Sequence, residues 1–421
     1  MSSPILQEGH ASPGRLFLLS LLASVFAVNV IDVFAPLLYP EIAATFGITV
    51  GTAIRLSAFS SIAGVVTGLA LSAFSIKFRY KTLLMAGVAA IVVCVLGVYL
   101  APDFLFAQVF YSLNGVGSVI VGVMAPTLIG ELYPLEKKAK RVSLVVATAT
   151  LALLIGSPVT GLIANTGGIT SWRSALLWFM LPATSISLIL VASIVPTKTT
   201  FRRLSAAKRA PFLNGYKEVL TNRSATACLT NTFFGGVFAA ASTFGPSFLN
   251  DVFGITPALR SLVAVASGVL LVVGVLTSGF LVDLVGRKRL LWGAAIPAVI
   301  FSVCGYPLSF FIPNMWIVLG FRFVGAFLGG FTFVAGSNLY LEQVPNYRGT
   351  MMSLQSSING LGVATGIIVG GTLLNIINNP VLGYPVAMVT LGALGLTGTL
   401  NIILFARDPV KSQQKAGALT L

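Results

Sequence analysis

Charged residues are scarce in this sequence. They make up 9% of its 421 residues, whereas about a quarter of an ordinary soluble domain is charged. Acidic residues are the scarcest, with 11 Asp and Glu against 26 Lys and Arg, while hydrophobic residues reach 56%. This composition excludes an ordinary soluble domain and indicates a protein that lies in lipid.

Twelve apolar segments account for this composition. A run of roughly 20 apolar residues crosses the hydrocarbon core as a helix, because a helix satisfies its own backbone hydrogen bonds. The sequence therefore predicts an all-α membrane protein with twelve transmembrane helices. The predicted spans are 16–39, 51–75, 82–101, 104–130, 142–165, 172–195, 224–249, 260–282, 290–312, 315–341, 350–375 and 382–406.

Histidine and cysteine are also nearly absent. The only histidine, His10, lies in the polar N-terminal tail, which excludes a histidine-based active site within the membrane. Cys94, Cys228 and Cys304 lie inside spans, where a thiol behaves as a small apolar side chain. The spans carry no paired carboxylates, and the chain has no phosphate-binding loop. We therefore expect no enzymatic activity, no cofactor and no metal site.

Positive charge is confined to alternate loops. Of the 26 Lys and Arg residues, 22 lie in the two tails and the even-numbered loops, and Arg322 lies inside a span. Since cytoplasmic loops carry the excess of Lys and Arg, this pattern predicts a multi-pass protein of the inner or plasma membrane with both termini cytoplasmic. The net charge of +15 is then explained by contact with anionic lipid, and we expect no nucleic-acid partner.

The chain repeats itself at a spacing of 207 to 211 residues. Residues 46–49 recur at 253–256, and 81–84 at 288–291. Because the matching loops lie on the same side of the membrane, we infer a parallel duplication. The predicted units are an N-terminal six-helix bundle (1–195), a cytoplasmic linker (196–223) and a C-terminal six-helix bundle (224–421).

One loop resembles a known family signature. Residues 279–289 read GFLVDLVGRKR, which is similar to the G-x-x-x-D-x-x-G-R-K-R loop of the major facilitator superfamily. The resemblance covers nearly the whole chain and implies two pseudo-symmetric six-helix bundles. It also implies a cytoplasmic gate made by Gly279, Asp283, Gly286, Arg287, Lys288, Glu342 and Arg348. The matching N-terminal loop has Ile76 in place of the Asp, so we expect the working latch in the C-terminal half. Alternatively, these charges only enforce topology.

Helix five carries a second resemblance. Gly156, Pro158 and Gly161 look like the antiporter motif of the drug:proton branch of that superfamily, although Ala152 replaces its first Gly and Ser157 is inserted before the Pro. Residues 344–350 look typical of efflux permeases. The glycines would allow close packing against a neighbouring helix, which is also a sufficient explanation for them.

Two ionisable residues lie well inside predicted spans. Such residues are costly and usually functional. By these boundaries Asp32 on helix one and Arg322 on helix ten lie at equal depth below the outer surface. We predict that they form a proton-coupling pair, which loads or releases a proton as it separates or meets. The repeat offset of 211 matches Arg322 to Tyr111, so the charge of helix four in that branch has moved to helix ten. A static salt bridge between the halves is the alternative.

Other polar residues suggest a substrate cavity. Helix one brings Asn29, Asp32 and Pro36 to one face. Opposite them the sequence predicts Tyr111, Asn114, Asn231, Phe234, Asn338, Gln355 and Asn359. An apolar wall with few polar groups suits amphipathic organic solutes and does not suit simple anions. Each residue alone could instead form an interhelical hydrogen bond.

These features predict a secondary active transporter. We expect a proton-coupled efflux antiporter for small organic solutes or drugs that works by alternating access. Its partners would be a small-molecule substrate, protons and membrane lipid, and we expect a monomer. The alternative is an uptake symporter or uniporter for a sugar, organic acid or amino acid. A membrane enzyme or receptor is the weakest reading.

Overall fold

The computed structural model is helical throughout the residues that it describes, which are 15–74, 78–133, 141, 144–145, 147–168, 170–195 and 212–408. Within them, twelve helical segments are long and apolar enough to cross a membrane. Each coincides with a predicted span, so the predicted all-α fold with twelve spans is confirmed.

The first six spans form one bundle. They comprise α1 (Arg15–Phe46), α2 (Val50–Ala53) with α3 (Arg55–Phe74), α4 (Tyr80–Leu100), α5 (Phe104–Leu132), the span Ala147–Ala164 and the span Trp172–Ile194. Two short π-helical turns, Ala152–Gly156 and Leu176–Met180, precede α7 (Ser157–Ala164) and α9 (Leu181–Ile194); α8 is Trp172–Ala175.

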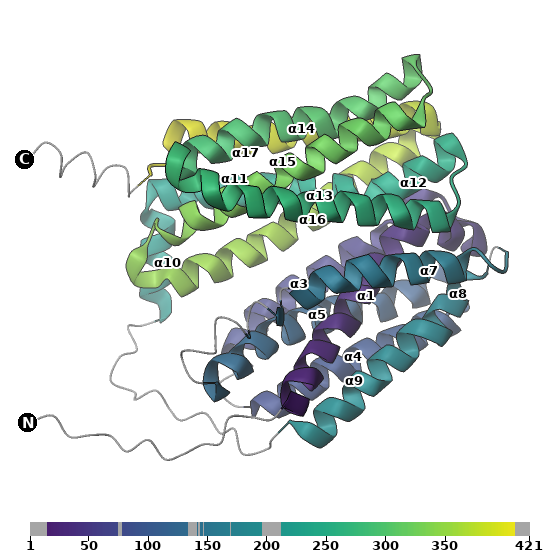
Figure 1. Cartoon of the computed structure of the whole chain (residues 1–421), viewed down its shortest axis with the longest axis horizontal. Coiled ribbons are helices and arrows are strands. Elements are labelled where there is room, and N and C mark those ends of the chain that lie inside the picture. Colours follow the sequence, from purple (N-terminus) through teal and green to yellow (C-terminus); the bar gives the residue numbers. More distant parts are fainter. Residues whose placement is uncertain are drawn as a thin grey trace, which may run out of the picture.

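The last six spans form the second bundle, which Figure 1 shows in teal to yellow above the first. They comprise α11 (Arg223–Ala239) with α12 (Ala241–Phe253), α13 (Pro257–Val285), α14 (Arg287–Phe311), α15 (Met315–Leu341), α16 (Arg348–Ile377) and α17 (Pro380–Phe405). The predicted linker contains the helix α10 (Phe212–Thr221), and a 3₁₀ turn, Pro345–Tyr347, precedes α16.

Helix α1 is longer than the sequence pattern predicts. It continues to Phe46 instead of ending at 39, although Pro36 and Pro40 lie within it and Leu38 has non-helical dihedrals. Proline kinks a helix without having to end it. The helix ends where Gly47 adopts a left-handed conformation with φ of 64°, and Gly254 repeats this after α12 with φ of 65°. The repeated sequence motif is therefore a duplicated helix stop.

The two bundles touch mainly near one face of the molecule. We call the face where α1 begins and α17 ends the near face, and the face where α1 ends and α13 begins the far face; they lie to the left and right in Figure 1. Close to the far face, a Cβ added at Gly51 would lie 2.5 Å from the carbonyl oxygen of Gly371. One added at Gly161 would lie 2.7 Å from that of Pro257. Glycine thus lets α2 meet α16 and α7 meet α13.

Candidate functional site

Asp32 lies at the middle of α1, facing the space between the bundles. Its Oδ1 accepts hydrogen bonds from Asn114 Nδ2 at 2.7 Å and from Ser118 Oγ at 3.3 Å, both on α5. Its Oδ2 accepts only a long contact of 3.4 Å from Ser118 Oγ. Within the described chain Asp32 forms no ion pair. One carboxylate oxygen is therefore held by α5 while the other stays available to the cavity.

A cavity of about 440 Å³ opens beside Asp32. Helices of both bundles build it: α1, α3 and α5 on one side and α16 on the other. Its volume lies in the range of small-molecule sites. The residues that line it are Asp32, Ser60, Ser61, Gly64, Val65, Gly68, Gly115, Ser118, Val119, Ser356, Ser357, Asn359, Gly360 and Val363.

The structure places few of the predicted cavity residues on this wall. Asp32 and Asn359 line the cavity, and Asn114 lies behind Asp32 as its hydrogen-bond donor. Tyr111 is buried, and its hydroxyl donates to the carbonyl oxygen of Ile31 at 3.2 Å. Asn29 donates to the carbonyl oxygen of Val25 at 2.8 Å. Tyr111 and Asn29 therefore do not line the cavity, because their polar groups are satisfied inside the first bundle.

The predicted residues of the second bundle also lie elsewhere. Asn231 donates to the hydroxyl of Tyr340 at 2.6 Å, and Phe234 packs against Gly398 of α17. Asn338 donates to the carbonyl oxygen of Val334 in its own helix, and Gln355 is partly buried. None of these four is among the residues that line the cavity in this conformation, and the polar group of Asn231 is turned to a neighbouring helix. Five serines, which sequence reasoning left out, take their place.

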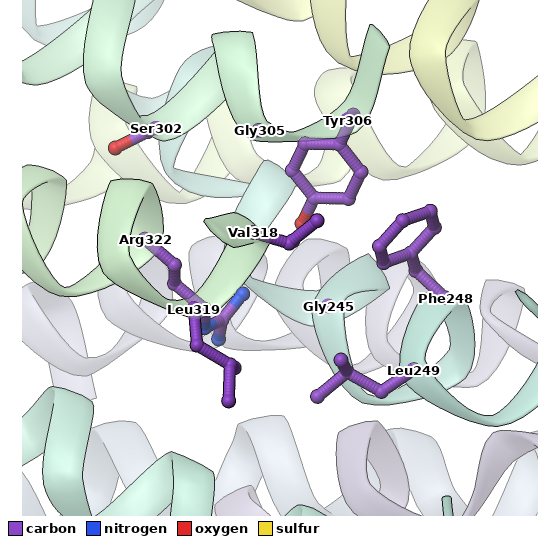
Figure 2. Close-up of a pocket in the computed structure, with 9 residues that line it drawn as sticks. All are labelled: Gly245, Phe248, Leu249, Ser302, Gly305, Tyr306, Val318, Leu319 and Arg322. Atoms are coloured by element: carbon purple, nitrogen blue, oxygen red, sulfur yellow. The ribbon is translucent and has the colours of Figure 1, made fainter. Parts of the chain in front are cut away.

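Arg322 lies within the second bundle. Its Nε donates to Ser267 Oγ at 3.4 Å, and its guanidinium group covers Gly245, where an added Cβ would lie 2.0 Å from Nη1. Figure 2 shows it pointing into a small space of about 10 Å³ beside Tyr306 and Phe248. That space is about the size of one water. Arg322 therefore joins α12, α13 and α14 in this structure.

The predicted pairing of Asp32 with Arg322 is not formed here. Asp32 lies 14 residues before the end of α1, whereas Arg322 lies seven residues after the start of α15. At 1.5 Å per residue these positions are about 21 Å and about 10 Å from the far ends of their helices. The prediction of equal depth is wrong because α1 extends beyond Pro40.

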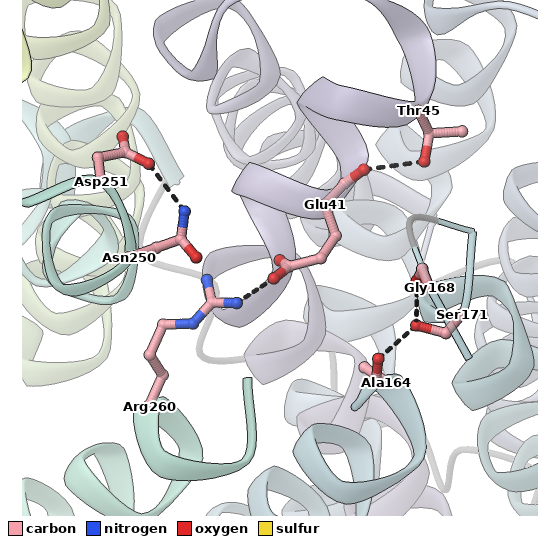
Figure 3. Close-up of polar contacts among 8 residues, drawn as sticks. All are labelled: Glu41, Thr45, Ala164, Gly168, Ser171, Asn250, Asp251 and Arg260. Atoms are coloured by element: carbon pink, nitrogen blue, oxygen red, sulfur yellow. Dashed lines mark hydrogen bonds and ion pairs between the residues drawn. The ribbon is translucent and has the colours of Figure 1, made fainter. Parts of the chain in front are cut away.

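An ion pair that the sequence did not predict joins the bundles near the far face. Arg260 of α13 donates through Nη2 to Oε1 of Glu41 on α1, as Figure 3 shows. The Arg260 side chain is fully buried and that of Glu41 is 15% exposed. Within the described chain, Nε and Nη1 of Arg260 and Oε2 of Glu41 have no hydrogen-bond partner. The predicted end of helix one at 39 had left Glu41 in a loop; Gly47 was the available signal that the helix continues.

Comparison with known families decides the classification. The sequence profile of the Major Facilitator Superfamily matches residues 20–278 and 232–420. The chain belongs to the Major Facilitator Superfamily. It is therefore a membrane transporter and not an enzyme.

Relatives of known sequence or structure agree with this. The uncharacterized MFS-type transporter YceJ of Bacillus subtilis (strain 168) is 24% identical over 315 residues, which are 73% of this chain and 77% of that protein. The inner membrane transport protein YnfM of Escherichia coli (strain K12) is 27% identical over 152 residues, 36% of this chain and 34% of that protein.

Solved structures share the fold. A D-xylose-proton symporter has a TM-score of 0.75 at 16% identity and covers 94% of this chain and 99% of its own. A bacterial homologue of the human lysosomal transporter Spinster, in an inward-facing unoccupied conformation, has a TM-score of 0.76 at 16% identity and covers 94% and 97%. These similarities extend over nearly the whole of each chain.

The superfamily loop signature lies at the near face. Gly286 makes the turn between α13 and α14 with φ of 90°, and Arg287 forms an ion pair of 3.8 Å with Glu342. Lys288 Nζ donates to the carbonyl oxygens of Ile403 and Ala406, each at 2.8 Å. The side chains of Asp283 and Arg348 lie outside the described part, and so does Ile76. An added Cβ at Gly279 would have no neighbour within 4 Å, so no helix packs closely against this glycine here.

Lys288 has a counterpart in the first bundle. Lys81, at the matching position of the repeat, donates to the carbonyl oxygen of Ala192 near the end of α9 at 2.7 Å. In each bundle a lysine from the third span thus meets the carbonyl end of the sixth, where positive charge is favourable. Each copy of the repeated sequence, 81–84 and 288–291, begins with this lysine.

The antiporter-like residues of helix five lie between α1 and the second bundle. An added Cβ at Gly156 would lie 2.8 Å from Val30 of α1, and one at Gly161 would lie 2.7 Å from Ser261 Cβ of α13. Ser157 Oγ donates to the carbonyl oxygen of Ser261 at 3.3 Å. Close packing, which the sequence indicated, is therefore what these glycines provide in this structure.

Proposed function

We propose that this transporter exports small organic solutes in exchange for protons, and that Asp32 carries the proton. One observation supports this most directly: Asp32 is the single ionisable residue among the described residues that line the cavity between the bundles. An ionisable group within a membrane span is costly and usually marks a transport pathway.

The surroundings of Asp32 suit proton exchange. Burial of a carboxyl group favours its neutral form, whereas hydrogen-bond donors and water favour the charged form. Asn114 and Ser118 donate to Oδ1, Oδ2 accepts only the long contact from Ser118, and the cavity opens beside the carboxylate. A movement that closes the cavity around Asp32 therefore changes the balance between the two forms, and a solute in the cavity would be exchanged for a proton.

We infer that the described conformation is open to the near face. The bundles meet through Glu41 and Arg260, through Gly161 and Pro257, and through Thr49 Oγ1, which donates to Asn375 at 2.6 Å; all three contacts lie near the far face. The near face carries the Lys- and Arg-rich loops, so we assign it to the cytoplasm and the chain to the inner or plasma membrane. Its similarity to an inward-facing structure supports this assignment.

In the proposed transport cycle, Asp32 and Arg322 would pair only in a different conformation. Arg322 points into its own bundle here, so a meeting of the two would require the bundles to rock. In the described state Arg322 is a packing residue of the second bundle.

The test is proton movement coupled to solute in purified vesicles. The protein would be reconstituted into liposomes containing a pH-sensitive dye, and a set of organic cations, sugars and amino acids would be added without a gradient. We expect an active solute to move protons in the opposite direction, and an imposed pH gradient to concentrate that solute. Proton movement in the same direction as the solute would instead identify the uptake symporter, and solute movement without protons would identify a uniporter.

A further inference from the structure

The cavity also indicates which solutes fit. We propose that it selects small hydrophilic organic cations, with an amine bound at Asp32 and several hydroxyl or amide groups bound by serines and Asn359. This inference rests on the proposed transport role of the cavity, and it narrows the predicted class, which had included amphipathic drugs.

The charge on the cavity wall favours a cation. Among the described lining residues Asp32 is the only charged one, and it has no cation beside it. The buried Arg260 pairs with Glu41, and the partly buried Arg322 contacts Ser267. An anion in this cavity would face a carboxylate without compensation, whereas an ammonium group would pair with the available Oδ2.

The cavity wall also carries free hydroxyl groups. Within the described chain Ser60, Ser61, Ser356 and Ser357 form no side-chain hydrogen bond, and neither does the amide of Asn359. Many other hydroxyl groups of the spans bond to their own helix, as Thr67 does to the carbonyl oxygen of Ala63 and Thr365 to that of Leu361. The cavity hydroxyls are therefore free to bind water or a polar solute.

The apolar side chains of the wall are short and aliphatic. The largest are Val65, Val119 and Val363, and no aromatic residue is among the described lining residues. An aromatic ring would offer a face to a delocalised lipophilic cation. The wall offers hydroxyl groups instead, which a lipophilic ion would leave without partners at a cost. A solute with its own hydroxyl groups replaces the lost water contacts.

A matched set of probes tests this directly. Glucamine and sorbitol have the same carbon chain and differ in one amine for one hydroxyl group, and tetraphenylphosphonium is a lipophilic cation. Thermal unfolding of the purified protein in detergent would be followed as each probe is added. We expect glucamine to raise the melting temperature at a concentration about tenfold below that needed for sorbitol, since an ion pair adds to the hydrogen bonds. We expect tetraphenylphosphonium to have the weakest effect.

Variants separate the contribution of the Asp32 charge from that of the serine hydroxyl groups. Asp32→Asn should abolish the preference for glucamine over sorbitol, and Asp32→Glu should retain it. The double change Ser356→Ala with Ser357→Ala should weaken both polyols about fivefold, as expected for a lost hydrogen bond or two. Ser353→Ala, one turn earlier on α16 and outside the lining residues, is the matched control.

The outcomes are decisive for the solute class. Stabilisation by tetraphenylphosphonium below the concentration needed for glucamine, or equal effects of glucamine and sorbitol on the wild type, would overturn the inference. The wild-type comparison needs no variant to fold. Binding in detergent also needs no gradient, so a cavity that binds glucamine without moving protons would refute the proposed exchange and leave the solute class standing.

Discussion

The two bundles share their structural devices and differ in their buried charges. Both end a helix at a left-handed glycine, Gly47 and Gly254, and both hold their sixth span with a lysine, Lys81 and Lys288. The carboxylates Asp32 and Glu41, however, lie in the first bundle, and Arg260 and Arg322 lie in the second. Duplication has thus kept what folds each bundle, whereas the charged groups at the interface differ, with Asp32 and Glu41 on the first bundle and Arg260 on the second.

The largest expected effect comes from the cavity carboxylate of the first bundle. Asp32→Asn should reduce transport driven by a pH gradient to the level of empty liposomes, because the cavity then holds no proton carrier. Exchange of solute without a gradient should persist for a neutral solute such as sorbitol. Radiolabelled uptake measures both.

The matched control for this change is Asp103→Asn. Asp103 caps α5 by accepting from the backbone N–H of Phe106 at 2.8 Å, outside the cavity, and Asn caps helices as well as Asp does. Full gradient-driven transport by the Asp32 variant would contradict its role.

The next effect concerns the ion pair that joins the bundles. Glu41→Ala leaves Arg260 buried without a partner, which costs about 3–5 kcal/mol when a buried pair is broken. The contact exists only while the far face is closed, so we expect the variant to open that face. A cysteine at Thr49 or Asn375 should then react faster with a membrane-impermeant thiol reagent added from the far side.

A double variant sharpens this prediction. Adding Arg260→Met removes the uncompensated charge and should recover part of the lost thermal stability, because an apolar side chain can replace a buried ion pair. Equal labelling rates in the wild type and in Glu41→Ala would show that the pair does not hold the far face closed.

A smaller effect tests the equivalence of the two lysines. Lys81→Met and Lys288→Met each keep the apolar stem and remove the hydrogen bonds to the last carbonyls of a helix. We expect a loss of about 1–2 kcal/mol in each case. Unfolding in detergent measures this loss, and it should be somewhat larger for Lys288, which contacts two carbonyl oxygens. A large loss for only one of them would break the symmetry between the bundles.

The smallest effect is expected between Asp32 and Arg322. Since they do not contact each other here, their losses of stability should add within about 0.5 kcal/mol in a double-mutant cycle of Asp32→Asn and Arg322→Ala. Coupling beyond that value would show that the state in which they meet is populated at rest.

The sequence predicted the spans and the duplication well, because both depend on long stretches of composition. The position of single side chains was harder to predict. Asn231 and Tyr111 are polar residues within spans, yet their side chains bond to Tyr340 and Ile31 and do not line the cavity. Serines such as Ser356 were not selected because serine usually bonds to its own helix, and only the structure shows that these do not.

Glu41 illustrates a second limit. The predicted span ended at 39, where the apolar run ends, whereas the helix continues to Phe46 and stops at Gly47. The glycine motif at 46–49 was visible as a repeat and could have been read as a helix end. With that interpretation, Glu41 would have been placed in the same helix as Asp32.

The π-helical turn at Ala152–Gly156 has a consequence for how such a chain can diverge. It lies directly before Ser157, the residue that is extra relative to the antiporter pattern. A π-helical turn holds one residue more than an α-helical turn, so an insertion is absorbed locally and the rest of the helix keeps its phase. Gly161 therefore still faces α13. Removing one residue from the turn should restore an ordinary α-helix with the same interface, which makes this span a place where the length of the gene can change while the contact surface is inherited intact.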